Sequence, residues 1–193
     1  MPNWTSTLVT MKGIGKMTEL YSESNGRLHF DFNKIVPEPK TPEECVEKYG
    51  SRYLDSVDEN GKSTRALMHS DGDDWFNWYD WHCDFWGTKW NACETHIIDD
   101  DHVRFDTAWA DPVPIFEALS SKHPDLELTT ESVHEDCVVS GARYAYGACV
   151  ENNYLDYSPF TDDGDFDQAA EEAALEKVRQ FNSQCDKNEP GLT

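Results

Sequence analysis

The thirty residues from Trp81 to Ala110 constrain the fold of this chain more than any other stretch, because two hydrophobic periods meet there. Before and into this stretch, aromatic side chains recur every three or four residues, which predicts an amphipathic helix over residues 73–86. Asp71 stands at the expected N-cap, and Gly87 lies just beyond the expected C-terminus. The predicted apolar face, which we expect to pack against a sheet, comprises Trp75, Trp78, Tyr79, His82 and either Phe85 or Trp86.

After Gly87 the hydrophobic period changes to two, which is typical of strands. Alternate side chains in residues 92–98 and 103–109 are apolar, β-branched or aromatic. Three consecutive aspartates at 99–101 separate the two segments and favour a turn. The sequence therefore predicts a β-hairpin, one face of which carries Val103, Phe105, Thr107 and Trp109.

Further periodic segments flank this unit. Thr41 followed by Pro42 is typical of a helix start, and Asp111-Pro112 opens another helix that ends before Pro124. This order predicts an α+β fold, an elaborated ferredoxin-like sandwich in which helices pack on one face of an antiparallel sheet, with an additional C-terminal helix. We assign residues 1–150 to the ferredoxin-like domain, with an inserted helix at 71–86, and residues 151–193 to an acidic linker and an amphipathic helix. The remaining predicted strands span 3–11, 28–32, 126–130 and 142–150, and the remaining helices span 16–23 and 166–181.

Several motifs resemble those of a known family. Trp-Gly-Thr-Lys-Trp-Asn-Ala at 86–92 and Phe-Asp-Thr-Ala-Trp at 105–109 resemble the YubB-type ferredoxin-like domain of conjugative plasmids and phages, which includes the Api92-like phage proteins. Met-Pro-Asn-Trp at 1–4 and Phe-Asp-Phe-Asn-Lys-Ile-Val-Pro at 30–37 fit the same family, so the resemblance covers residues 1–150. It implies a ferredoxin-like fold and a mobile-element origin, and it supplies no activity and no catalytic residue. The chain departs from the family pattern after Trp109, where Ala-Asp-Pro-Val-Pro stands in place of Ser-Pro-Pro.

Charge is the strongest functional clue. The 193 residues have a net charge of −22, and the acids are unevenly distributed. Residues 1–54 are neutral overall, whereas residues 55–111 carry a net charge of −10 and residues 151–193 a net charge of −8. Such a field repels nucleic acid and anionic membranes and attracts basic partners.

The N-terminus lacks the continuous apolar run of a signal peptide, and no segment approaches membrane-spanning length. The six cysteines show no Cys-x-x-Cys spacing, so we expect reduced thiols. These features predict a protein of the bacterial host cytoplasm.

No motif for catalysis, metal binding or a cofactor is complete. Cys93 and His96 are three residues apart in a predicted strand, so strand alternation places them on opposite faces, and we expect no zinc site. Asp163, Asp165 and Asp167 match the first ligands of a calcium loop, but the required glycine and glutamate are missing. We instead expect Asp165 to cap the last helix. Gly61-Lys62-Ser63 lacks the preceding strand and first glycine of a phosphate-binding loop.

Two functional hypotheses remain. In the first, a non-enzymatic protein uses acids on ordered elements to imitate nucleic acid and to inhibit a basic, nucleic-acid-binding host defence complex, as anti-restriction and anti-CRISPR proteins do. In the alternative, the aromatic cluster at 75–90 lines a pocket for a small ligand or substrate, with Asp84, Lys89 or His96 as polar groups. The acidic surface predicted to bind the partner comprises Asp73, Asp80, Asp84, Asp99, Asp100, Asp101, Asp167, Glu171 and Glu172.

Overall fold

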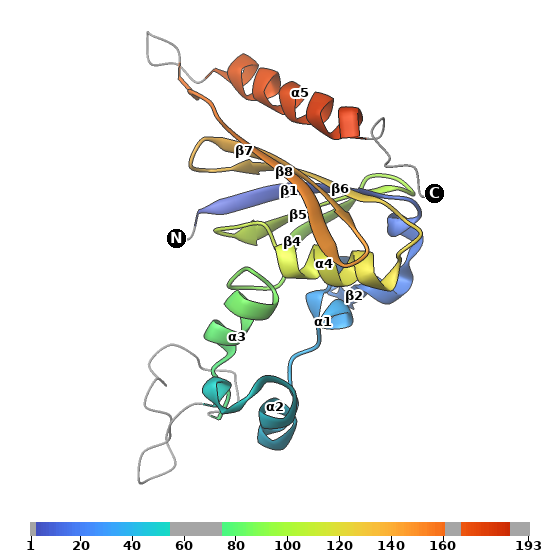
Figure 1. Cartoon of the computed structure of the whole chain (residues 1–193), viewed down its shortest axis with the longest axis vertical. Coiled ribbons are helices and arrows are strands. Elements are labelled where there is room, and N and C mark those ends of the chain that lie inside the picture. The colour runs from blue at the N-terminus through green and yellow to red at the C-terminus, as the bar shows by residue number, and fades with distance from the viewer. Residues whose placement is uncertain (1–2, 55–74, 161–166, 186–193) are drawn as a thin grey trace, which may run out of the picture.

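A six-stranded antiparallel sheet forms the centre of the molecule (Figure 1). The computed structural model describes residues 3–54, 75–160 and 167–185. The strand order is β4-β5-β1-β6-β7-β8, so the first strand of the chain lies in the middle. The strands are β1 (Trp4–Met11), β4 (Cys93–Ile97), β5 (His102–Ala108), β6 (Leu128–His134), β7 (Val138–Ala145) and β8 (Ala148–Asp156).

Helices cover both faces of this sheet. The helix α4 (Val113–Lys122) packs below β7 and β8, whereas α5 (Gln168–Cys185) packs on the opposite face over β6, β7 and β8 (Figure 1). The α4 face carries the main core, and a second small core of Val139, Ala174 and Val178 lies beneath α5. The predicted α+β ferredoxin-like architecture is confirmed, and its C-terminal helix docks on the sheet.

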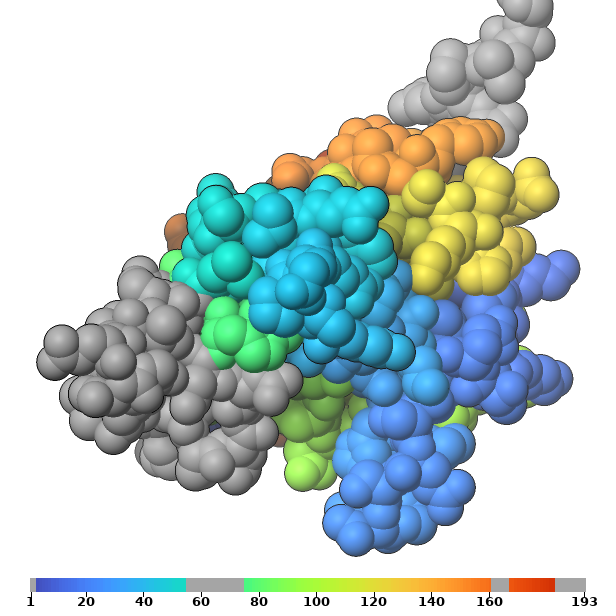
Figure 2. Space-filling model, turned by 90° about the horizontal axis from the view of Figure 1, so that it is seen from below, coloured from blue at the N-terminus to red at the C-terminus, as the bar shows by residue number. Residues whose placement is uncertain are grey.

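The helices α1 (Phe32–Ile35), α2 (Pro42–Tyr49) and α3 (Trp78–Phe85) extend the molecule on the α4 side (Figure 1). Thr41 caps α2 as predicted, since its hydroxyl accepts a hydrogen bond from the Glu44 amide at 3.2 Å. Figure 2 shows this side: residues 32–54 cover much of it and leave only part of α3 visible. None of the helices among the described residues has the length and apolar character needed to span a bilayer.

The predicted aromatic helix is shorter, and its buried face differs in part from the predicted one. It begins at Trp78 behind an N-cap at Asn77, whose side chain accepts a hydrogen bond from the Asp80 amide; the proposed cap at Asp71 lies outside the described residues. His82 and Trp86 are buried as predicted, but Trp81 is also fully buried and Tyr79 is 39% exposed, so the predicted face is only partly correct. The physical reason is that α3 packs against residues 49–53 rather than against the sheet: the Trp81 ring lies 5.4 Å from the Tyr49 ring.

Two predicted elements are hairpins instead. The predicted helix at 16–23 is replaced by 3-10 turns at Ile14–Lys16 and Thr18–Leu20, followed by the two-stranded sheet of β2 (Tyr21–Ser24) and β3 (Arg27–Phe30). Asn25 and Gly26 both have positive φ in the turn, as Asn-Gly hairpins require. The predicted single strand at 142–150 is the β7–β8 hairpin, which turns at Tyr146-Gly147. The proposed domain boundary at residue 150 therefore falls inside β8.

Candidate functional site

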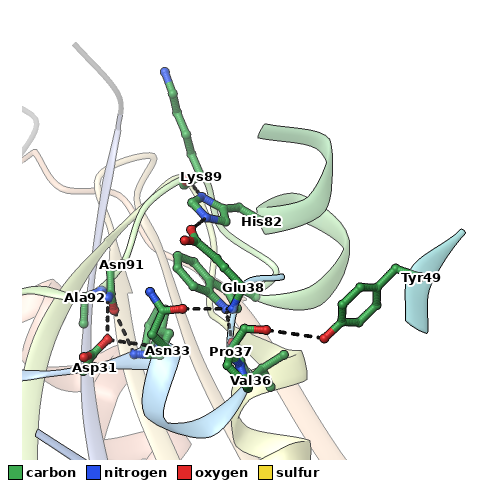
Figure 3. A network of polar contacts seen from close by, with 12 residues as sticks. Asp31, Asn33, Val36, Pro37, Glu38, Tyr49, His82, Lys89, Asn91 and Ala92 are labelled. Carbon is green, nitrogen blue, oxygen red and sulfur yellow. Dashed lines mark hydrogen bonds and ion pairs between the residues drawn. The ribbon is translucent and has the colours of Figure 1, made fainter. Parts of the chain in front are cut away.

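The motif at 86–92 joins the start of the hairpin to residues 31–38. The Asn91 side chain accepts a hydrogen bond from the Phe32 amide at 2.9 Å and donates one to Asp31 at 2.8 Å (Figure 3). The same Asp31 carboxylate caps α1 by accepting from the Asn33 amide at 3.0 Å. These bonds fix the β3–α1 junction, so Asn91 has a structural role.

Trp86 and His82 complete this network. The Trp86 indole N–H donates to the Val36 carbonyl at 2.9 Å, and its ring stacks on the His82 ring at a centroid distance of 3.8 Å. His82 Nδ1 lies 2.8 Å from the Lys89 carbonyl oxygen, and its Nε2 contacts the Glu38 carboxylate (Figure 3). His82 is 7% exposed and is held on both sides, as expected for a histidine of the core.

A β-bulge in β4 overturns the alternation argument for Cys93 and His96. Cys93 pairs with Asp106 and His96 pairs with Arg104, which are two residues apart on β5. The bulge therefore puts the two side chains on the same face of the sheet. Among the described residues, no three histidine, cysteine or acidic side chains are grouped to hold a metal ion, and Cys45, Cys83, Cys93, Cys137 and Cys149 are free thiols.

The predicted acidic residues do not form one continuous array. Asp73 lies outside the described residues, and the others lie at three separate places: on α3, in the β4–β5 turn and on α5. On α3, Asp80 accepts a hydrogen bond from the Asn77 side chain at 2.6 Å. Asp84 accepts one from the Tyr53 hydroxyl at 2.8 Å and pairs with Arg52. Because α3 and α5 lie on opposite sides of the sheet, one flat partner cannot contact both (Figure 1).

The aspartates of the β4–β5 turn hold the turn against the segment after β1. Asp101 accepts a hydrogen bond from the Gly13 amide at 2.7 Å, and Asp100 pairs with Lys16. Asp99 accepts from the Asp101 amide at 2.9 Å and pairs with His102 at 2.7 Å, and these bonds lower the pKa of its carboxyl. Each carboxylate is thus fixed in position by a local partner.

On α5 the acids are also held. Asp167 accepts hydrogen bonds from the first helical amides, those of Ala169 and Ala170 at 3.0 and 3.1 Å. Asp163 and Asp165 lie outside the described residues. Glu172 pairs with Arg179 at 2.7 Å. Glu171 accepts from the Tyr157 hydroxyl at 3.0 Å. Burial and then Glu171 raise the pKa of Tyr157 to about 12, so this hydroxyl remains a donor at neutral pH.

Glu171 belongs to the candidate site, a cleft of about 550 Å³ between the start of α5 and the sheet. The cleft has carboxylates from three separate segments, and its described lining contains no lysine or arginine. Glu135 accepts a hydrogen bond from the Trp4 amide at 2.9 Å, which fixes one carboxylate at the end of β6. The groups that define this acidic cleft are Trp4, Asp106, Glu135, Tyr157, Phe160 and Glu171.

Chemically, the acidic cleft suits a cation with an apolar stem. Carboxylates attract an ammonium or guanidinium group, and aromatic faces attract the same groups through their quadrupoles. Of the cleft residues, sequence reasoning selected only Glu171. The others lie on β1, β5 and the segments after β6 and β8, which only the strand pairing brings together.

A buried polar network lies at the edge of the cleft. His134 lines the cleft and lies 3.5 Å from the Asp111 carboxylate, which also accepts hydrogen bonds from the hydroxyls of Ser132 at 2.5 Å and Ser140 at 3.0 Å. Burial raises the pKa of the Asp111 carboxyl, but hydrogen bonds from His134 and the serines outweigh this effect, so the pKa lies below its ordinary value. Asp111 therefore remains ionised inside the fold.

Beside α3, a hollow of about 380 Å³ is lined by Arg52, Asp80, Cys83 and Asp84, so the alternative pocket at 75–90 stays a hypothesis, but the described lining of this hollow contains no aromatic ring. The rings of Tyr49, Trp81 and Phe85 contact one another, as expected for a core. Asp84 contacts Tyr53 and Arg52, while the Lys89 ammonium lies over the Trp90 ring, so these two groups have different surroundings.

A family model described as the ferredoxin-like domain in Api92-like protein matches residues 85–181, half of the chain. The chain belongs to this family. The match begins at the end of α3 and extends into α5 as far as residue 181, so most of the C-terminal helix, which the motif resemblance left outside, is part of the family domain.

A solved structure, that of protein api92 from Yersinia pseudotuberculosis, is 17% identical, with a TM-score of 0.34. The alignment covers 43% of this chain and 32% of that chain, so the chain spans about a third of the length of the protein it matches. No curated protein matches.

Proposed function

We propose that this protein is a non-enzymatic acidic binding protein whose partner is a basic, nucleic-acid-binding complex of a bacterial host. By occupying the basic groove of that complex in the host cytoplasm, it acts as an inhibitor of the anti-restriction or anti-CRISPR type. The acidic cleft carries the proposal, because carboxylates and aromatic rings line it without a neutralising lysine or arginine among its described residues. The net charge of −22 likewise favours a positively charged partner.

The fixed positions of the carboxylates also support this proposal. Glu135 and Glu171 are both oriented by hydrogen bonds within the protein, so binding a cation costs less conformational entropy than it would with free side chains. The three separate acidic regions favour one local contact at the cleft over a long imitation of a nucleic acid strand. Charge attraction should make association fast and sensitive to salt.

The test compares two variants with the same change in net charge. Asp106→Asn with Glu135→Gln neutralises two carboxylates of the cleft, and the glutamine oxygen can still accept the Trp4 amide. Glu43→Gln with Glu47→Gln neutralises two exposed carboxylates on α2, away from the cleft. Reversing Asp80 and Asp84 is a poorer test, because their bonds to Asn77, Tyr53 and Arg52 stabilise α3.

Tagged proteins would be incubated with a bacterial lysate at low and physiological salt, and the bound proteins identified by mass spectrometry. We expect basic nucleic-acid-binding proteins that DNA or RNA displaces. The cleft variant should bind them more weakly by a factor of roughly 2 to 30, since each partly exposed ion pair contributes about 0.2–1 kcal/mol. Equal losses of binding affinity in both variants, or binding that does not change with salt, would show that the acidic residues serve only solubility.

A further inference from the structure

A second surface gathers exposed aromatic rings around one lysine. Tyr79, Trp90 and Trp109 are 39%, 36% and 45% exposed. The Lys89 ammonium lies 4.4 Å from the centroid of the Trp90 ring, 5.2 Å from that of Trp109 and 6.0 Å from that of Tyr79. We call these four residues the aromatic patch. Large exposed rings grouped in this way are typical of protein-binding surfaces.

The backbone at Trp109 is strained. Its φ is +75°, a conformation that bulky residues rarely adopt, and its amide donates to the Asn3 carbonyl at 2.8 Å. The Tyr79 ring lies edge-on to the Trp109 ring at 6.2 Å. Strain of this kind persists where the surroundings fix it, and it concentrates at functional positions. Here the strained residue holds an indole at the surface.

The charge of the aromatic patch is opposite to that of the cleft. In the described part of the chain, the ammonium of Lys89 contacts aromatic rings, whereas Lys16, Arg52 and Arg179 pair with carboxylates. The two surfaces are adjacent, because Trp4 lines the cleft and its ring lies 6.1 Å from that of Trp90. A partner that places basic groups in the cleft must therefore present something else to Lys89.

We propose that the aromatic patch is a second docking surface for the same protein partner, and that it takes an apolar side chain beside a carboxylate. This inference rests on the proposed function. The rings bury the apolar group, and the ammonium pairs with the carboxylate without leaving their faces. Two adjacent surfaces of opposite charge fix the orientation of the partner, since the reversed arrangement would place like charges together.

The probes are three capped tripeptides added to the ¹⁵N-labelled full chain, with tryptophan indole signals followed by NMR. A leucine–phenylalanine–aspartate peptide should shift the Trp90 and Trp109 signals and leave buried Trp81 unchanged. The same peptide with asparagine should bind more weakly by up to about fivefold, the contribution of one exposed ion pair. A leucine–phenylalanine–arginine peptide should shift Trp4 first, because Trp4 lines the acidic cleft.

Lys89→Met keeps an apolar stem over the rings and removes the charge. In this variant the aspartate and asparagine peptides should bind equally. Trp109→Phe should weaken both peptides, while Glu135→Gln should weaken only the arginine peptide. The inference would be overturned if the aspartate peptide caused no saturable shift up to about 10 mM, which corresponds to very weak binding. It would also be overturned if the asparagine peptide bound the wild type equally well. The proposed function would stand in either case if the arginine peptide still bound the cleft.

Discussion

Gly141→Ala should show how the C-terminal helix is held on the sheet. Gly141 lies on β7 beneath α5, and a Cβ atom added there would lie 2.2 Å from Cγ1 of Val178. Its φ is not in the positive range, so alanine itself is unstrained at this position. Without the clash, a change from glycine to alanine would stabilise the protein by about 0.4–1 kcal/mol through the unfolded state.

The clash with Val178 makes Gly141→Ala destabilising instead of stabilising. Neither β7 nor the buried Val178 side chain can move freely, and overpacking of this kind costs about 1–3 kcal/mol. Val178→Ala alone removes two methyl groups, which costs about 1.6 kcal/mol at 0.8 kcal/mol each, plus a term for the cavity. Combining the substitutions puts the new methyl group into the space that the valine vacates. The double variant should therefore be more stable than the sum of the single effects by about 1–2 kcal/mol.

The measurement is urea unfolding of the wild type, both single variants and the double variant, followed by circular dichroism and tryptophan fluorescence. Wild-type-like stability of the Gly141→Ala variant would refute the close packing of α5 on β7. Additive effects in the double variant would show that the two residues are not in contact.

Three further predictions concern the core, the buried carboxylate and metal ions. Trp81→Ala should lower the free energy of unfolding by about 3–5 kcal/mol, and Trp78→Ala should lower it less, because Trp78 is half-buried. Trp81→Phe should have the smallest effect, since the indole N–H of Trp81 has no partner among the described residues. Equal urea midpoints for the two alanine variants would contradict this assignment. Asp111→Asn should lower the stability at neutral pH by about 2–3 kcal/mol. The folded-state pKa of Asp111 lies below its unfolded value, so its ionised form stabilises the fold above the unfolded pKa, and this stability is lost as pH falls through the folded pKa. The melting temperature of the asparagine variant should therefore fall less steeply with decreasing pH than that of the wild type. Equal slopes for the two proteins at acid pH would contradict the role of Asp111. Treatment with a chelator should leave the melting temperature unchanged, whereas a loss that zinc restores would reveal a metal site.

Local patterns in the sequence were sufficient for several elements. The alternation around Asp99–Asp101 correctly predicted the β4–β5 hairpin, and Thr41-Pro42 correctly predicted the start of α2. The Asn25-Gly26 turn is also a local pattern, but the strands on either side of it are only four residues long. The prediction of a helix at 16–23 was therefore wrong. Short segments carry too few residues for their period to separate helix from strand.

The sequence by itself determined the fold class, the excess of acid and the family, because periodicity, composition and long motifs are properties of neighbouring residues. It did not determine which aromatic residues of α3 are buried, since that depends on the packing of Tyr49 and Tyr53 against Trp81 and Phe85 rather than on the helix alone. The acidic cleft likewise exists only in the tertiary structure. Trp4 and Glu135 are 131 residues apart and share a hydrogen bond because β1 pairs with β6. Long-range strand pairing decides such contacts, and no local pattern encodes the pairing partner.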